Sequence, residues 1–144
     1  MSTLADLFLC PTSELTTLDC EDSPLKKLGG SYDGVEFKDV TSLDLKILWA
    51  LLEDADWAPD THPSTMIHRA VDEEDTAAIE HFPARMISVF ANADDARIAS
   101  VARNAAGTTN FKRFEADQLM WMMKEVRELA RRADGRELCL WSAL

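Results

Sequence analysis

Residues 115–141 read EADQLMWMMKEVRELARRADGRELCLW, and this stretch decides the fold class. From Leu119 to Ala130 its apolar side chains recur every three or four residues, which is the period of one helix face. Acids stand near the start and arginines near the end, as the helix dipole favours, and Gly135 ends the helix. The apolar run at 137–142 then predicts a terminal strand. A long helix followed by a strand favours the α+β class.

Three further helices are predicted upstream. Pro83 suits the first position of a helix that stops near Asn92. Asp94 is a suitable N-cap for the next helix, which ends at Gly107. Leucines and a tryptophan at helical spacing predict another core-facing helix over residues 43–53.

The strand signals are shorter. Two partly alternating runs within residues 66–82 flank a polar connection of hairpin-loop length, and we interpret them as a β-hairpin. Residues 35–37 alternate as a short strand does, and the terminal strand could pair with either. The predicted fold is a helix-rich α+β single domain over residues 1–144, with about four helices, a small antiparallel sheet and a less regular segment at 1–40.

Composition places the chain among globular proteins, with 47% hydrophobic and 28% charged residues in 144. No apolar run approaches the roughly 20 residues that cross a bilayer. Residues 1–10 contain no Lys or Arg, so they lack the basic start of a secretory signal. Cys10, Cys20 and Cys139 are odd in number and show no CxxC spacing, which favours reduced thiols. We therefore expect a cytoplasmic protein with no membrane partner.

The net charge of −11 is unevenly distributed. Residues 1–80 hold 18 acidic and 5 basic side chains, a net −13, whereas residues 81–144 carry +2. Such a field repels nucleic-acid phosphates and anionic membranes, and it attracts a basic protein partner. Solubility alone is the simpler explanation, because many bacterial cytosolic proteins are acidic.

The motifs that carry chemistry are missing from the sequence. It contains no phosphate-binding glycine loop, HExxH, EF-hand or GxSxG pattern. We therefore expect neither a metal nor a cofactor, and the missing motifs argue against an enzyme. The alternative is a small enzyme or ligand-binding domain that uses His62, His68 and His81 with nearby acids. A thiol nucleophile at Cys10 or Cys20 belongs to the same alternative.

Trp57 lies in an acidic loop bounded by prolines, a composition that resembles an interface anchor for a basic surface. The predicted partner-binding residues are acids and one tryptophan of two loops: Glu53, Asp54, Asp56, Trp57, Asp60, Asp72, Glu73, Glu74 and Asp75. The alternative is that Trp57 packs back on the preceding helix.

These observations predict a small acidic protein-binding module. In composition it resembles immunity or inhibitor proteins that block a basic site on a toxin or nuclease. A structural subunit of a homo-oligomer is the third alternative. Met120, Met122 and Met123 could line either the core or a subunit contact, so the sequence is compatible with a monomer or a homodimer.

Overall fold

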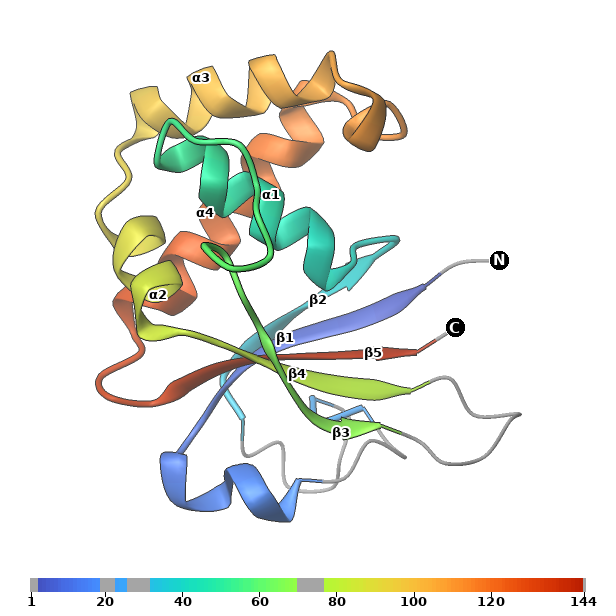
Figure 1. Ribbon diagram of the computed structural model, residues 1–144, viewed down its shortest axis with the longest axis vertical. Coiled ribbons are helices and arrows are strands. Elements are labelled where there is room, and N and C mark those ends of the chain that lie inside the picture. Colours follow the sequence, from blue (N-terminus) through green and yellow to red (C-terminus); the bar gives the residue numbers. More distant parts are fainter. Residues whose placement is uncertain (1–2, 19–22, 26–31, 70–76, 144) are drawn as a thin grey trace.

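Four α-helices lie on one side of a five-stranded antiparallel sheet in the part of the chain that the structure describes (Figure 1). The structure is a computed structural model, and it describes residues 3–18, 23–25, 32–69 and 77–143. The strands are β1 Leu4–Cys10, β2 Gly34–Lys38, β3 Thr65–Arg69, β4 Ala78–Phe82 and β5 Glu137–Ala143. The helices are α1 Ser42–Leu52, α2 Ala84–Ala91, α3 Asp95–Ala106 and α4 Ala116–Arg131, with 3-10 turns at Thr12–Thr17 and Thr109–Phe111. Of these, α3 packs on α1 and α4 away from the sheet. The predicted α+β class is confirmed.

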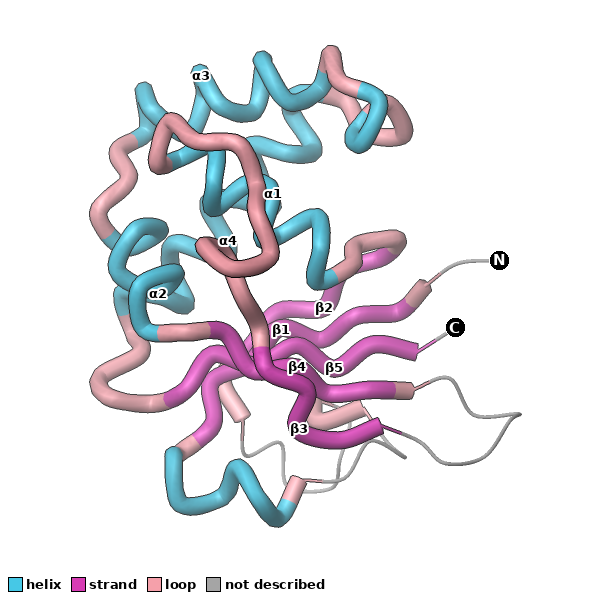
Figure 2. Tube along the Cα trace, viewed as in Figure 1, coloured by secondary structure: helices cyan, strands magenta, loops and turns pink. Residues whose placement is uncertain are grey.

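The strand order is β2-β1-β5-β4-β3 (Figure 2), and every neighbouring pair is antiparallel. The predicted hairpin is confirmed as β3 and β4. The terminal strand β5 pairs with β4, which confirms the predicted pairing with the hairpin. On its other side β5 pairs with β1, not with β2. The sheet is larger than predicted because residues 4–10, which carry no alternating pattern, form the strand between β2 and β5.

The sheet is buried on both faces. Leu7, Leu9 and Leu140 face the helices, whereas Phe8 and Cys139 point to the opposite face. That second face is covered by side chains of the segment after β1 and of the approach to β2, namely Leu15, Leu18, Leu25 and Tyr32. Among the described residues, no helix is both long and apolar enough to cross a bilayer.

A capping box opens α1, next to the turn that follows β2. The hydroxyl of Thr41 accepts a hydrogen bond from the Asp44 amide at 3.2 Å, and the Asp44 carboxylate accepts one from the Thr41 amide at 2.9 Å. Both bonds satisfy amides that lack a partner inside the helix. The box therefore sets where the chain turns from the sheet into the helical layer.

We expect Thr41→Ala to lower the free energy of unfolding by about 1 kcal/mol, because one amide of the first turn loses its acceptor. Urea denaturation followed by circular dichroism measures the change. Ser42→Ala is the matched control at the neighbouring position and should leave stability within about 0.5 kcal/mol of the wild type. Equal effects of the two substitutions would contradict the capping role of Thr41.

Candidate functional site

The acidic loop after α1 contains two kinds of carboxylate. Glu53 receives a hydrogen bond from Arg85 Nε at 2.9 Å, and Asp54 pairs with Arg97 at 2.6 Å. Asp56 and Asp60 are exposed and form no ion pair with any described residue. Two of the predicted partner-binding acids are thus already neutralised by arginines of the second half. The predicted residues Asp72, Glu73, Glu74 and Asp75 lie outside the described residues.

His62 ties this loop to the end of α1. Its side chain is 1% exposed, its Nδ1 accepts a hydrogen bond from the Ala58 amide at 3.3 Å, and its Nε2 lies 3.1 Å from Glu53 Oε1. Because Nδ1 is an acceptor, the proton is on Nε2 and is donated to Glu53. The ring also stands edge-on to Trp49, with centroids 4.8 Å apart. Through these contacts His62 anchors the loop to α1.

Trp57 lies between the loop and the helical layer. It is half-buried and lines a hollow of about 310 Å³ together with Ile47 and Leu51 of α1 and Thr108. Its Nε1 is buried and has no hydrogen-bond partner among the described residues. This placement favours the alternative that Trp57 packs back on the helix that precedes it.

The three histidines have separate surroundings. His81 Nε2 lies 2.5 Å from Glu137 Oε2 and is opposite Thr65 and Cys139 in the sheet, whereas His68 is opposite Ile79. His68 and His81 therefore do not face each other across the hairpin. Within the described ranges, no group of three or more His, Cys, Asp or Glu side chains could hold a metal ion.

Cys10 and Cys139 lie on the buried face of the sheet away from the helices. Burial, and to a lesser extent the charges of Glu14 and Glu137, raise the pKa of Cys10 to about 11. Burial also raises the pKa of Cys139. The Cys10 thiol donates to the carbonyl of Pro11 at 3.3 Å. Both thiols are therefore protonated at neutral pH and are poor nucleophiles; Cys20 lies outside the described residues.

We expect iodoacetamide at pH 8 to leave Cys10 and Cys139 unmodified in the native protein and to modify both after denaturation. The raised pKa of Cys10 lowers its thiolate fraction by about 100-fold relative to an ordinary thiol, and burial restricts access further. Mass spectrometry of proteolytic peptides measures the modification site by site. Native modification of either cysteine at the rate of free cysteine would contradict the placement.

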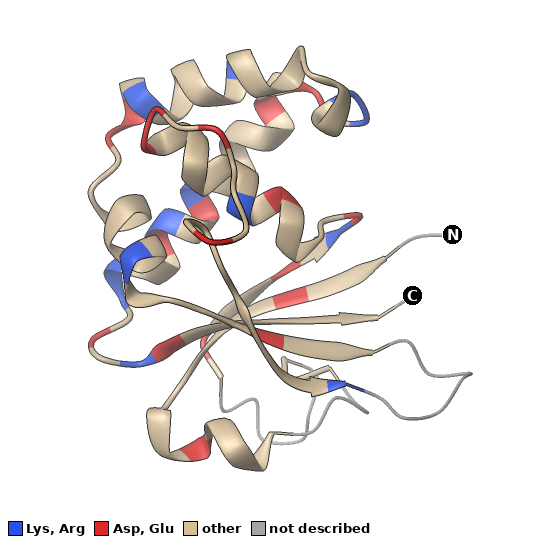
Figure 3. Ribbon diagram, viewed as in Figure 1, with Lys and Arg blue, Asp and Glu red and all other residues tan. Residues whose placement is uncertain are grey.

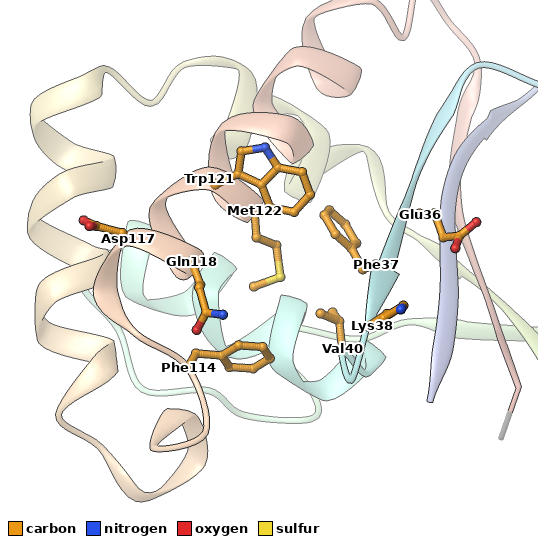
Figure 4. A pocket seen from close by; sticks show the side chains of 9 residues that line it. All are labelled: Glu36, Phe37, Lys38, Val40, Phe114, Asp117, Gln118, Trp121 and Met122. Atoms are coloured by element: carbon orange, nitrogen blue, oxygen red, sulfur yellow. The ribbon is translucent and has the colours of Figure 1, made fainter. Parts of the chain in front are cut away.

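An apolar groove of about 550 Å³ lies between β2 and the first turns of α4 (Figure 4). Its lining residues come from these two elements and their flanks: Glu36, Phe37, Lys38, Val40, Phe114, Asp117, Gln118, Trp121 and Met122. Trp121 is 52% exposed although it is one of the largest apolar side chains, while Phe37 and Met122 are buried. The rings of Phe37 and Trp121 meet edge to face, with centroids 5.7 Å apart. The groove therefore presents an aromatic surface to solvent.

Arg113 fixes the elements that border the groove. It donates to the carbonyl of Asp39 from Nε at 3.3 Å and from Nη2 at 3.2 Å, and it also pairs with the carboxylate of Asp44. Its guanidinium lies 4.5 Å above the ring of Phe114. Asp39 adopts a positive φ of 59°, in the turn between β2 and α1. One side chain thus links this turn to the segment that leads into α4.

Ion pairs connect the two halves of the chain. The acids come from residues 33–54 and the arginines from residues 85–132: Asp33–Arg132, Asp44–Arg113, Glu53–Arg85 and Asp54–Arg97. Hydrogen bonding by Arg132 lowers the pKa of Asp33 below its usual range. Acidic and basic positions accordingly lie interleaved around the helices (Figure 3). Part of the negative charge of the first half is therefore compensated within the fold.

Sequence reasoning did not predict the groove. Its two sides come from residues 36–40 and 114–122. No local sequence pattern indicates that these two segments lie together. The available signal was Trp121, which lies on the flank of the apolar stripe of its helix and not within it. No protein-family model, curated protein or solved structure matches the chain.

Proposed function

We propose that the protein is a small acidic protein-binding module that docks on a basic partner through the groove between β2 and α4. The observation that carries this proposal is the half-exposed Trp121, set against Phe37 in an apolar groove. Tryptophan is enriched among residues that dominate binding energy, and such residues sit in apolar pockets with a polar surround. Here Asp117 and Gln118 supply that surround.

The charge of the chain supports a basic partner. A net charge of −11 accelerates encounter with a positively charged surface and slows encounter with a second copy of the same chain. Asp56 and Asp60 add exposed carboxylates that no described residue neutralises. The finer form of the proposal is an immunity or inhibitor protein that covers the basic site of a toxin or nuclease, and the charge is what supports it.

The partner and its docking site can be tested together by photo-crosslinking. A photoreactive amino acid at Gln118, in the groove, should crosslink a basic protein from cell extract, and Trp121→Ala in the same protein should abolish that crosslink. Crosslinking should weaken as NaCl rises from about 0.05 to 0.5 M, because the attraction is screened.

Met66→Ala provides the matched control, because Met66 is 49% exposed on β3 at the far edge of the sheet. It should leave the crosslink unchanged. A crosslink that persists in the Trp121→Ala protein would contradict the proposal. Crosslinking of the chain to itself, together with a dimer mass in light scattering, would replace it with the homo-oligomer.

A further inference from the structure

We infer that the loop between α1 and β3, residues 53–64 (green in Figure 1), is a pH-sensitive switch in which protonation of His62 releases the turn 58–62. This inference goes beyond the proposed function and does not depend on it, because the groove between β2 and α4 is lined by residues outside this loop.

The turn 58–62 is closed around a neutral imidazole. The carbonyl of Ala58 accepts hydrogen bonds from the amide of Thr61 at 3.1 Å and from the amide of His62 at 2.8 Å. The amide of Ala58 in turn donates to Nδ1 of His62 at 3.3 Å. Only an unprotonated ring nitrogen can accept such a bond. The main chain of this turn therefore depends on the charge state of one side chain.

A second proton on the ring would have to bind at Nδ1, because Nε2 already carries the proton that it donates to Glu53. Nδ1–H and the amide of Ala58 would then be two donors that face each other. The His62 side chain is 1% exposed, and a buried donor without an acceptor costs about 1–3 kcal/mol. Movement of the Ala58 amide away from the ring removes this conflict. Protonation of His62 therefore favours an open turn.

The other side of the ring is held to α1 in both charge states. Nε2 lies 3.1 Å from Oε1 of Glu53, the residue that follows the last turn of α1. A positive charge on the ring strengthens this hydrogen bond, because its acceptor is a carboxylate. Arg85 of α2 donates to the other oxygen of Glu53, from Nε at 2.9 Å. The bond that protonation breaks is thus the one to Ala58, and the ring stays on the helix.

The other charged groups around the loop have partners elsewhere or face solvent. Lys46 of α1 donates to Ser64 Oγ at 3.0 Å, and this hydroxyl donates to Glu80 of β4 at 2.7 Å. Asp54 pairs with Arg97 of α3. The remaining acids of the loop are exposed: Asp56 and Asp60. Histidine is the side-chain type whose charge ordinarily changes between about pH 5 and 8, and His62 is the only histidine of the loop.

Release of the turn would change what the loop presents to solvent. Trp57 directly precedes Ala58 and is half-buried. Its Nε1 has no hydrogen-bond partner among the described residues, so no such bond of the indole opposes its displacement. Acidification should therefore expose Trp57 next to the carboxylate of Asp56.

Hydrogen exchange of single amides, measured by NMR on the full chain at pH 7.5 and pH 5, tests the switch. We expect the protection factor of the Ala58 amide, which corrects for the intrinsic pH dependence of exchange, to fall at least tenfold on acidification. The Ala55 amide is the matched control in the same loop, because it donates to the carbonyl of Ala50 at 2.9 Å and not to His62. Its protection factor should change by less than twofold. Nitrogen-15 shifts of the His62 ring should show protonation over the same range.

His62→Asn separates the charge from the hydrogen bond. Its side-chain oxygen can accept from the Ala58 amide in place of Nδ1, and it takes up no proton over this range. We expect the protection factor of Ala58 in His62→Asn to be the same at both pH values. His81→Gln is the control for another histidine, because His81 belongs to β4 and lies beside Glu137. This variant should keep the tenfold fall at Ala58.

Protonation of the His62 ring without a fall in protection at Ala58 would overturn the inference. A ring that stays neutral down to pH 5 would overturn it as well. A parallel loss of protection at Ala55 and Ala58 would mean that the opening is not confined to the turn, which also contradicts the switch. If His62→Asn does not fold, the wild-type titration decides. Ring protonation and the loss at Ala58 must then share one midpoint, and different midpoints would refute the inference.

Discussion

Phe8→Ala should lower the free energy of unfolding by about 3–5 kcal/mol, the range for deleting a fully buried phenylalanine side chain. Phe8 is 0% exposed on the sheet face away from the helices. Its ring lies 5.3 Å from that of Tyr32, measured between centroids. It also neighbours Gly34, where an added Cβ would lie 3.0 Å from the Cβ of Phe8. Because these neighbours are closely packed, they cannot easily move to fill the cavity that Phe8→Ala creates.

Urea denaturation followed by tryptophan fluorescence measures this loss. Met66→Ala is the control, because it also removes a large apolar side chain from a strand, but one that is 49% exposed. It should change stability by no more than about 0.5 kcal/mol. A loss below about 1 kcal/mol for Phe8→Ala would mean that the second face of the sheet is not packed as described.

Phe8 also illustrates what the sequence could not supply. Six of the seven residues of β1 are buried, so the strand shows no alternation of polar and apolar positions. A short apolar run of this kind is indistinguishable by pattern from other buried segments. The hairpin β3–β4 was predictable because its strands flank a polar connection, and α1, α3 and α4 were predictable because caps and periodicity are local. Only pairing with β5, more than 120 residues away, makes 4–10 a central strand.

The site divides in the same way. The acidic loop is conspicuous in the sequence, but the arginines that pair with Glu53 and Asp54 lie 32 and 43 residues further along the chain. No local pattern shows that these acids are already paired. The groove likewise requires Phe37 and Trp121, which are far apart in sequence, to come together. Ion pairs with distant arginines therefore leave fewer acids of the predicted partner-binding surface available to a partner. The contact between Phe37 and Trp121 forms an apolar groove that the sequence did not predict.

The uneven charge therefore has a structural role as well. Arginines of the second half also bond to carbonyls at or near helix ends: Arg97 to Leu51, Arg127 to Ala93 and Arg131 to Ala91. Such cations satisfy carbonyls that lack a partner within the helix and complement its dipole. The basic second half is thus occupied in joining the helices to one another and to the acidic first half. The charge available to a partner lies on acids that form no ion pair within the described part of the chain, such as Asp56 and Asp117.

Glu53→Ala and Asp56→Ala should separate these two classes of acid. Glu53→Ala should lower the free energy of unfolding by about 2–3 kcal/mol, because it leaves the Nε2 proton of His62 buried without an acceptor and releases Arg85. His62 is only 1% exposed, so in the native loop its Nε2 proton depends on Glu53 for an acceptor. Asp56→Ala, three residues along the same loop, should change stability by no more than about 0.5 kcal/mol.

Glu53→Gln distinguishes the hydrogen bond from the charge. Its amide oxygen can still accept from His62, so it should recover part of the stability lost in Glu53→Ala. Urea denaturation of the three variants measures the differences. Equal stability of Glu53→Ala and Asp56→Ala would contradict the stabilising role of Glu53 in the loop. Glu53 would then be available to bind a partner. The expected difference instead assigns Glu53 to the fold, so that any binding defect of Asp56→Ala reports on the partner alone.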